Sequence, residues 1–372
     1  MSEPIRILHC VGGMNVGGVE TLIMNIYRRI DKRKIQFDFA VEEENTCFYD
    51  EEILSMGGRI YSHPKPSKFG IKSYVMALRR TLSENGAFSC VHSHVHFFSG
   101  IILRTARKNG VPLRIAHSHT SHSADNNKLL RKLYSSYMRR LIHHNATHLF
   151  ACSNLAGRSL FGENFNFLIL PNVISLEQYN DALYDHTELR KKYGFPEDAM
   201  IIGHVGRFDP PKNHKFLINI FRKVLDEVPN AHLLLIGDGP LKNQINEMVN
   251  LLKLESRVHF WGIRRDVPKL LNILDLFLFP SLYEGLGTVL IEAQAVGVPC
   301  VVSDGITPEV DLGLHLVHFL SLDSKPEVWV TTMLKAQKVS APSRWENRRL
   351  TLKRSGYDVD DAVKFLTNLY SS

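Results

Sequence analysis

Long apolar runs and paired cysteines are both missing from this chain of 372 residues. No stretch of eighteen consecutive apolar residues occurs, so no transmembrane helix is predicted, and residues 1–6 lack the apolar core of a signal peptide. The five cysteines are an odd number, widely spread and without a Cys-x-x-Cys pair. This pattern argues against a disulfide framework or zinc ribbon and predicts reduced thiols in the cytoplasm.

The remaining composition is that of an ordinary globular protein, with 44% hydrophobic and 22% charged residues. A chain of this length is expected to form two domains. The net charge of +7 is uneven, because residues 1–180 hold 22 Lys+Arg against 14 Asp+Glu, whereas residues 181–372 hold 23 against 24. The basic first half is expected to meet an anionic partner, with an acidic membrane surface preferred over nucleic acid.

Strand-like apolar runs alternate with helical stretches in both halves of the chain. In the first half they cover residues 4–11, 35–41, 58–62, 88–95, 113–117, 147–152 and 166–170; in the second they cover residues 200–205, 231–236, 258–260, 274–279 and 298–302. This order predicts an α/β protein with a helix-wound parallel sheet in each half. We predict domains over residues 1–172 and 173–357 with strand ends facing a central cleft, and a terminal helix over 358–372 that crosses back to the first domain.

Two glutamates eight residues apart, Glu284 and Glu292, follow the apolar run at 276–279. Gly285 and Gly287 are expected to open a helix here, and the unpaired N–H groups at a helix start attract phosphate. Eight helical residues rise about 12 Å, which suits a ligand with a sugar, a diphosphate and a ribose. The alternative is an unrelated surface glutamate and helix glutamate.

Two cations, Arg207 and Lys212, follow the strand-like run at 200–205 and are expected to point into the cleft. A charge pair at about 4 Å is worth roughly 4 kcal/mol at an effective dielectric constant near 20. The pair would therefore stabilise a departing nucleoside diphosphate without a metal ion. A solvated turn is the alternative.

The glycine loop at residues 12–18 lacks the patterns of a P-loop and of a dinucleotide-binding fold. Its amides would approach a substrate closely, although a structural turn explains the loop nearly as well.

Eleven of the 18 histidines lie in the first half of the chain. Three of them, His92, His94 and His96, alternate along one predicted strand and are expected to share a face. We expect them to be packing residues rather than a zinc site. His117, at a strand end, is preferred over His119 for orienting the sugar or the acceptor hydroxyl.

The segment at residues 128–140 combines an apolar stripe with basic residues. The stripe is Leu130, Leu133, Tyr134, Tyr137 and Leu141, and the cations are Lys128, Arg131, Lys132, Arg139 and Arg140. The stripe is expected to pack on the sheet; the alternative is that the basic face also docks on anionic lipid. Asp358 and Asp360 are expected to cap the last helix rather than to bind a metal.

Taken together, these motifs resemble family 4 of the retaining glycosyltransferases, over nearly the whole chain. The matching motifs are Gly17-Gly18-Val19-Glu20, His117 after a strand, Ala151-Cys152-Ser153, Pro171-Asn172, Gly206-Arg207 with Lys212, Gly237-Asp238-Gly239-Pro240, and Pro280-Ser281 with Glu284-Gly285, Gly287 and Glu292-Ala293. The resemblance implies the GT-B fold, with two Rossmann-like domains facing a cleft. It also implies an enzyme similar to those of bacterial exopolysaccharide and capsule assembly, with a UDP-sugar donor and a glycan or lipid-linked acceptor.

The resemblance assigns a role to each matching position. Arg207 and Lys212 would bind the diphosphate, Glu292 the ribose hydroxyls and Arg265 the base. Glu284 and the amides of Leu286, Gly287 and Thr288 would contact the transferred sugar. In the first domain, Gly13 would cover the phosphates and His117 would lie beside the sugar and the acceptor. His117, Arg207, Lys212 and Glu284 form the implied catalytic set. No metal or other cofactor is implied, and the expected location is cytoplasmic, peripheral on the inner face of the membrane.

Two departures from the family pattern leave the donor open. Val173-Ile174 follows Pro171-Asn172 where glycine is common, and the segment 304–309 lacks the usual glycine pair before Pro308-Glu309. A sugar-nucleotide epimerase on the same fold is the nearest rival. A basic nucleic-acid-binding protein is a rival of a different class, although neither a helix-turn-helix pattern nor an aromatic-basic sheet signature is evident.

Overall fold

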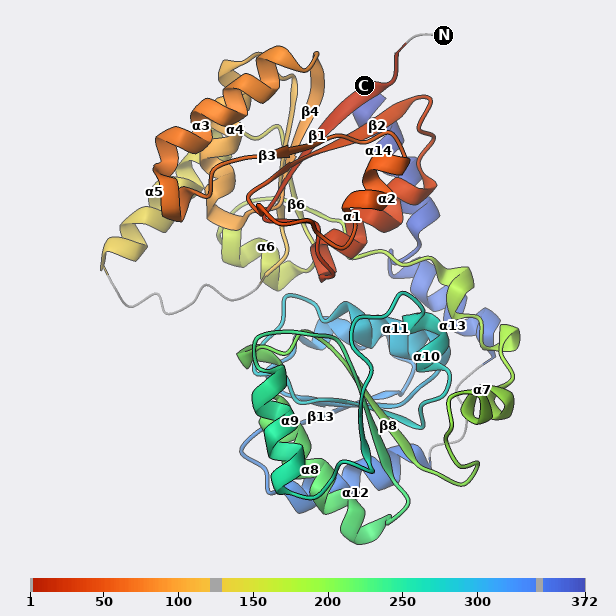
Figure 1. Cartoon of the computed structure of the whole chain (residues 1–372). Helices are drawn as coiled ribbons and strands as arrows, with labels where there is room; N and C mark the ends of the chain where they lie inside the picture. The colour runs from red at the N-terminus through yellow and green to blue at the C-terminus, as the bar shows by residue number, and fades with distance from the viewer. Residues whose placement is uncertain (1–2, 121–128, 339–343, 372) are drawn as a thin grey trace. The chain divides into compact units, whose positions relative to one another are not determined.

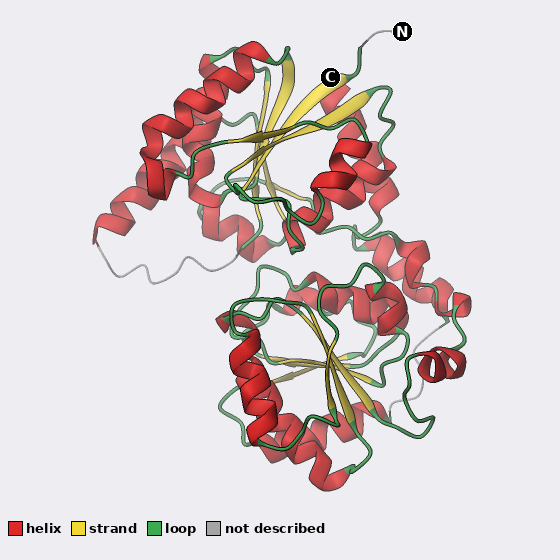
Figure 2. Cartoon of the chain, in the orientation of Figure 1, coloured by secondary structure: helices red, strands yellow, loops and turns green. Residues whose placement is uncertain are grey.

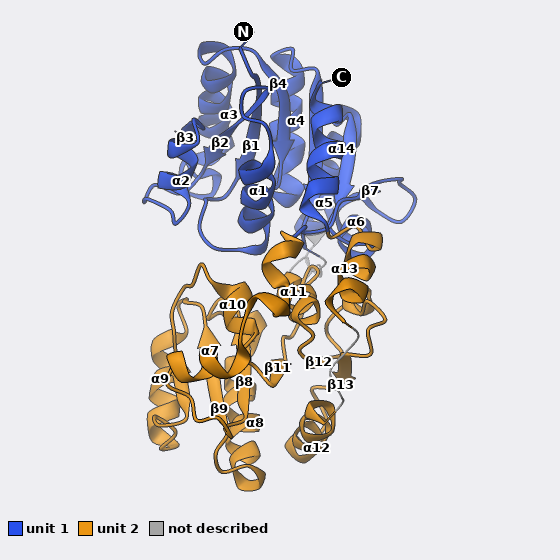
Figure 3. Ribbon diagram, turned by 90° about the vertical axis from the view of Figure 1, so that its right-hand side faces the viewer, with its two compact units in different colours: residues 1–174, 358–372 blue, residues 175–357 orange. Residues whose placement is uncertain are grey.

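The computed structural model describes residues 3–120, 129–338 and 344–371. The chain divides into two compact units, shown in blue and orange in Figure 3. Unit 1 comprises Met1–Ile174 and Asp358–Ser372, and unit 2 comprises Ser175–Tyr357. Each unit has a parallel sheet with helices packed against it (Figure 2).

Unit 1, which contains the strands labelled β1 to β4 in Figure 1, has a seven-stranded parallel sheet. Its strand order is β3-β2-β1-β4-β5-β6-β7. The strands are β1 (Ile5–Val11), β2 (Ile35–Val41), β3 (Ile60–Ser62), β4 (Phe88–Ser93), β5 (Leu113–Ser118), β6 (His148–Ala151) and β7 (Leu168–Ile169). The helices are α1 (Gly18–Arg29), α2 (Asp50–Ser55), α3 (Pro66–Glu84), α4 (Ser99–Lys108), α5 (Leu129–Asn145), α6 (Asn154–Phe161) and α14 (Val359–Ser371), with a 3-10 turn η1 (His96–Phe98).

Successive residues of the strands in unit 1 face opposite sides of the sheet, and each side is covered by its own apolar core. Ile7 and Phe37 belong to the core that α1 and the C-terminal helix α14 complete, the latter through Leu366 and Tyr370. Leu8 belongs to the core on the other face, together with residues of α3, α4 and α6. A sheet buried on both faces explains why its strands carry apolar residues on both faces rather than in strict alternation with polar ones.

Unit 2 contains a six-stranded parallel sheet in the order β10-β9-β8-β11-β12-β13. The strands are β8 (Ile201–Val205), β9 (His232–Ile236), β10 (Val258–Phe260), β11 (Leu276–Phe279), β12 (Cys300–Ser303) and β13 (Val317–Leu320). The helices are α7 (His186–Lys192), α8 (His214–Glu227), α9 (Lys242–Leu251), α10 (Val267–Leu271), α11 (Thr288–Val296), α12 (Pro326–Gln337) and α13 (Trp345–Arg354), with 3-10 turns η2 (Leu176–Tyr179) and η4 (Pro210–Lys212).

The predicted fold class, with a helix-wound parallel sheet in each half, is confirmed. In both sheets the strand order reverses at a central pair, between β1 and β4 in unit 1 and between β8 and β11 in unit 2. Ligands of such sheets bind outside the carboxyl ends of the strands at this reversal. The loops after these four strands are therefore where a ligand-binding site is expected.

The predicted packing of the apolar stripe of α5 on the sheet is wrong: four of its five residues are exposed, and the fifth, Leu141, is half-buried beside Gly100 of α4. Leu130, Leu133 and Tyr137 are 81%, 60% and 52% exposed, and Tyr134 is exposed as well. The helix instead buries Met138 and Ile142, one turn apart, against α4 at Gly100, where a Cβ would lie 2.8 Å from the Met138 carbonyl oxygen. Lys128, the first cation of the predicted segment, lies outside the described residues.

Two expectations from composition concern the membrane and the cysteines. Among the described residues, no helix has the length and apolar content needed to cross a membrane. All five cysteines are buried free thiols. The thiols therefore belong to the apolar cores, for example Cys90 on β4 in the core beneath α1 and α14.

Candidate active site

The carboxyl ends of the central strands β8 and β11 bring together two of the predicted site residues. Lys212 ends the 3-10 turn η4 after β8, and Glu284 lies in the loop between β11 and α11. The Lys212 Nζ donates a hydrogen bond to the Glu284 Oε1 at 2.5 Å. The two side chains are only 17% and 15% exposed, so this ion pair is largely shielded from solvent.

Lys212 is held in place along its whole length. Its aliphatic stem crosses Gly206, where a Cβ would lie 3.1 Å from both Cδ and Cε of the lysine. Its Nζ lies 4.7 Å from the centroid of the Phe279 ring, within the range of a cation–π interaction. The backbone N–H of Leu282 donates to the Pro211 carbonyl at 2.8 Å, which ties the two loops to each other. The ammonium group is thus preorganised before any ligand arrives.

Helix α11 begins at Thr288, four residues after Glu284. Gly287 adopts a left-handed conformation with φ of 76° at the helix start and, as a glycine, has no side chain of its own to cap the helix. Backbone N–H groups of the first turn lack intrahelical acceptors, and together with the helix dipole they favour an anion at this end. The buried side chain of Leu286 anchors the loop. The predicted 12 Å helical spacing of the two glutamates is wrong, because Glu284 precedes the helix.

Glu292 lies one turn into α11 and is half-buried. The hydroxyl of Tyr179, from η2, donates a hydrogen bond to its Oε1 at 2.8 Å. Burial raises the pKa of the Glu292 carboxyl to about 7, although the bond from Tyr179 acts in the opposite direction. The carboxyl is therefore oriented by Tyr179 and can exchange a proton near neutral pH.

Arg207 is exposed at the end of β8, and its guanidinium has no hydrogen-bond or ion-pair partner within the described parts of the chain. The loop after β9 packs closely against the loop that carries Arg207: a Cβ on Gly237 (φ 138°) would lie 2.0 Å from the Gly206 carbonyl oxygen. A Cβ on Gly239 would lie 2.6 Å from the Phe208 carbonyl oxygen. These glycines permit the close approach of two loops, a role that the sequence pattern alone did not reveal.

Arg265 is exposed in the loop after the edge strand β10. Two strands, β9 and β8, separate β10 from β11 in the sheet. Its assignment to the nucleotide base stays a prediction.

The predicted site residues of unit 1 lie at the carboxyl ends of its own strands. Gly13 follows β1, and a Cβ there would lie 2.9 Å from the Cβ of Glu43. His117, the penultimate residue of β5, is 1% exposed, and its Nε2 donates to the Leu170 carbonyl at 3.2 Å. Burial lowers the pKa of His117 well below its usual value, so the ring is neutral. His119, two residues on, is only half-buried and is the more accessible of the two histidines.

The prediction that His92, His94 and His96 share one strand face is wrong for His96. β4 ends at Ser93, and His96 starts η1 with φ of 48°. His92 and His94 do lie side by side, with ring centroids 4.3 Å apart. They form a cluster with His9, His117 and His119 that the sequence, which separates these residues by up to 110 positions, did not reveal.

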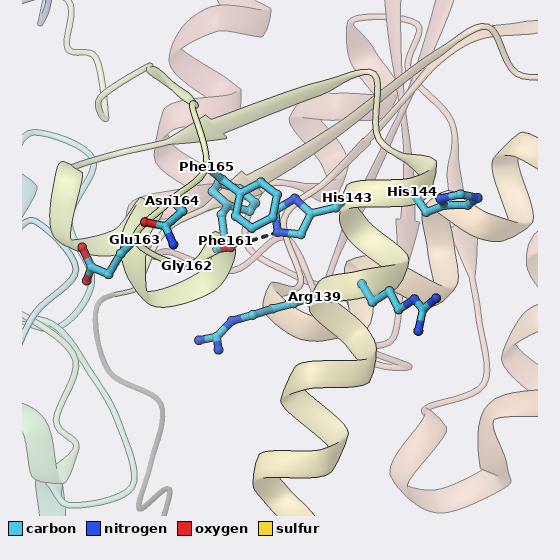
Figure 4. Close-up of a pocket in the computed structure, with 9 residues that line it drawn as sticks. Arg139, His143, His144, Phe161, Gly162, Glu163, Asn164 and Phe165 are labelled. Carbon is cyan, nitrogen blue, oxygen red and sulfur yellow. Dashed lines mark hydrogen bonds between the residues drawn. The ribbon is translucent and has the colours of Figure 1, made fainter.

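A pocket of unit 1 lies between α5 and the loop after α6 (Figure 4). It is lined by Arg139, Arg140, His143, His144, Phe161, Gly162, Glu163, Asn164 and Phe165. The His143 ring stacks on Phe165 with centroids 3.4 Å apart and donates through Nε2 to the Phe161 carbonyl at 2.9 Å. This pocket lies on the same basic helix as the exposed apolar stripe.

Comparison with known proteins identifies the family. Two family models match, Glycosyltransferase Family 4 over residues 16–177 and Glycosyl transferases group 1 over residues 185–320. EpsF of Bacillus subtilis (strain 168), named as a glycosyltransferase, is 42% identical over 374 residues, which cover 100% of this chain and 97% of that protein. The capsular polysaccharide biosynthesis glycosyltransferase CapH of Staphylococcus aureus is 25% identical over 89% of this chain and 90% of its own length.

The fold is also shared with solved structures. The structure of Anabaena HepE in complex with UDP-glucose superposes with a TM-score of 0.79 at 18% identity, covering 99% of each chain. At this identity the similarity establishes the shared two-domain fold alone.

Proposed function

The chain belongs to the glycosyltransferases of family 4 and group 1, and we propose that it transfers a sugar from a UDP-sugar to a glycan or lipid-linked acceptor. The proposed setting is exopolysaccharide or capsule-type biosynthesis, the activity named for CapH. One observation carries the proposal: the Lys212–Glu284 pair, at 2.5 Å, joins the loops after β8 and β11 close in sequence to the start of α11.

The donor is assigned to unit 2. Arg207, Lys212 and the amides at the start of α11 supply positive potential for a diphosphate. Glu284, through its ion pair with Lys212, lies where the sugar attached to that diphosphate would be, with the backbone of Leu286 to Thr288 beside it. The Glu292 carboxyl, oriented by Tyr179, is the acceptor of hydrogen bonds from the ribose hydroxyls. A UDP donor is supported by the UDP-glucose bound to HepE.

The proposed reaction retains the anomeric configuration of the sugar. The bond between the anomeric carbon and the β-phosphate oxygen breaks, and the acceptor oxygen bonds to the same carbon on the same face. The departing phosphate oxygen takes the proton of the acceptor hydroxyl, so no protein nucleophile is required. Lys212 and Arg207 stabilise the charge that develops on the leaving diphosphate, which makes the proposed reaction independent of a metal ion.

Helix α5 is proposed to dock on an anionic membrane surface. Its exposed Leu130, Leu133 and Tyr137 are suited to insertion among lipid headgroups, and they are more accessible than the sequence led us to expect. Arg131, Lys132 and the basic pocket around Arg139 and Arg140 would contact acidic headgroups (Figure 4). Such docking would bring a lipid-linked acceptor to unit 1.

A thermal-shift titration tests the donor assignment. The full chain is melted with UDP, GDP or ADP and their common sugars, each with and without EDTA. The proposal predicts a rise in melting temperature for the uridine nucleotides that EDTA does not alter. No shift with any of these ligands, or a shift that EDTA abolishes, would contradict it.

A further inference from the structure

Five histidines of unit 1 meet at the carboxyl ends of β1, β4 and β5, where the strand order of the sheet reverses. They are His9, His92, His94, His117 and His119. Neutral imidazole is the commonest metal ligand in proteins, and packing alone does not require ring nitrogens to face one another. Hydrogen bonds account for the facing nitrogens of His9 and His94 and of His94 and His119, but the buried Nδ1 of His117 has no such partner among the described residues.

His94 is the centre of the cluster. Its Nε2 lies 3.1 Å from the Nδ1 of His9, and its Nδ1 lies 2.9 Å from the Nε2 of His119. One ring nitrogen from each of His94, His117 and His119 lies within 4.8 Å of the other two. Nitrogens that bind one tetrahedral ion at about 2.0–2.1 Å are roughly 3.3 Å apart. Small rotations of the three rings would therefore complete a three-histidine site.

His117 already has the environment of a metal ligand. Its Nε2 donates to the Leu170 carbonyl at 3.2 Å, which fixes the ring and its tautomer. A hydrogen bond of this kind on the far nitrogen is the usual support of a ligating histidine. Its Nδ1 is buried and has no hydrogen-bond partner among the described residues. An unsatisfied buried nitrogen is unfavourable unless something binds it.

We propose that His94, His117 and His119 bind one divalent transition-metal ion of the zinc type. Three imidazoles without a carboxylate favour zinc, cobalt, nickel or copper over magnesium or calcium. Because His94 and His119 are half-buried, a water molecule can fill the fourth position and solvent can offset part of the charge. The ion would hold the strand end at His117 rigid. This site is in unit 1 and does not depend on the donor chemistry assigned to unit 2.

A second histidine set shares His94 but is less suitable. One nitrogen from each of His9, His92 and His94 also lies within 4.8 Å of the others. His9 and His92 are each 2% exposed, and they line the apolar part of a small cavity with Leu22, Ile26 and Phe37, a cavity that His94 and His117 also border. An ion surrounded by these apolar side chains would lose its hydration without an anion in compensation.

Cobalt titration of the full chain, without a histidine tag and stripped with EDTA, tests the site. The expected result is one equivalent of Co²⁺ with the visible absorption of tetrahedral cobalt, displaced by one equivalent of Zn²⁺. Removing a supporting outer-shell residue typically weakens metal binding about 10–100-fold, so loss of a ligand in His119→Gln should weaken it by more than about 100-fold. The exposed His144 provides the matched control, and His144→Gln should bind cobalt as the wild type does.

His9→Gln separates the two histidine sets, because it should leave most of the binding intact. The melting temperature of each metal-free variant verifies that it is folded, and Co²⁺ should raise that of the wild type but not that of His119→Gln. Absence of stoichiometric binding, binding that survives in His119→Gln, or an equal loss in His9→Gln would overturn the assignment.

Discussion

Lys212 and Glu284 should have opposite effects on the binding of a nucleoside diphosphate, although their side chains touch. In the free protein the Lys212 Nζ is bonded to Glu284 at 2.5 Å, so an incoming diphosphate competes with the carboxylate for the same ammonium group. Lys212→Met removes the attractive charge. Glu284→Gln removes the competitor and leaves the lysine free to bind phosphate.

The expected magnitude follows from the geometry of the pair. A phosphate charge about 4 Å from the ammonium is attracted by roughly 4 kcal/mol at an effective dielectric constant near 20. Desolvation and the lost bond to Glu284 offset part of this attraction. The net contribution left is about 1.5–3 kcal/mol, which is typical of one hydrogen bond to a charged group. Lys212→Met should therefore raise the Kd for UDP about 10–100-fold. Loss of this preorganised cation should lower kcat about 10²–10³-fold, also in Lys212→Ala.

Isothermal titration calorimetry with UDP measures both effects directly. Glu284→Gln should bind UDP at least as tightly as the wild type, yet turn over the donor sugar more slowly. Lys215→Met, at an exposed lysine of α8, is the matched control and should bind UDP normally. Equal weakening by Lys212→Met and Glu284→Gln, or no change in Lys212→Met, would refute the reasoning.

Three further predictions concern other parts of the molecule. Burial raises the pKa of Glu292 from 4.5 to about 7, so the stability that its protonated form contributes is fully present below about pH 4.5 and is lost as the pH rises through 7. In calorimetry at several pH values, Glu292→Gln should remove this pH-dependent part of the unfolding free energy, which is at most about 3 kcal/mol. A pH profile of stability that is the same in the variant and the wild type would contradict the prediction. Gly237→Ala should lower the free energy of unfolding by about 2 kcal/mol or more in chemical denaturation, because its Cβ would meet the Gly206 carbonyl. The control Gly12→Ala, whose Cβ would have no atom within 4 Å, should leave stability unchanged, and equal effects of the two would argue against the loop contact. Replacing Leu133 and Tyr137 together by Ser should abolish flotation with anionic vesicles while leaving the melting temperature unchanged, and flotation equal to that of the wild type would exclude docking through α5.

The fold class could be predicted from the sequence because a parallel sheet buried on both faces leaves a strong local signal. Residues 35–41 include Ile35, Phe37, Phe39, Ala40 and Val41, residues 88–95 include Phe88, Cys90, Val91 and Val95, and each run is followed by a helical pattern. Edge strands carry a weaker signal: β13 (Val317–Leu320), half-buried throughout, was not predicted. The strand predicted at 166–170 is reduced to two paired residues, Leu168–Ile169.

Within the candidate site, the sequence could indicate individual residues but not their partners. Lys212 and Glu284 are 72 positions apart, and only the pairing of β8 with β11 brings them together. The bond from Tyr179 to Glu292 spans 113 positions. Helix α5 was misinterpreted for a related reason, because its periodicity shows an apolar face but not which face contacts α4. The roles assigned to the site residues stay predictions until substrates are tested.

The central claim, metal-independent transfer with retention by the site in unit 2, is tested most directly by proton NMR of donor turnover. Wild-type chain and Lys212→Met are incubated with a UDP-α-sugar in EDTA, and the anomeric signals are followed while water replaces the acceptor. The account predicts that the α-anomer is released first, before mutarotation, and that Lys212→Met releases it about 10²–10³-fold more slowly. Initial release of the β-anomer, or an equal rate in the two proteins, would contradict it.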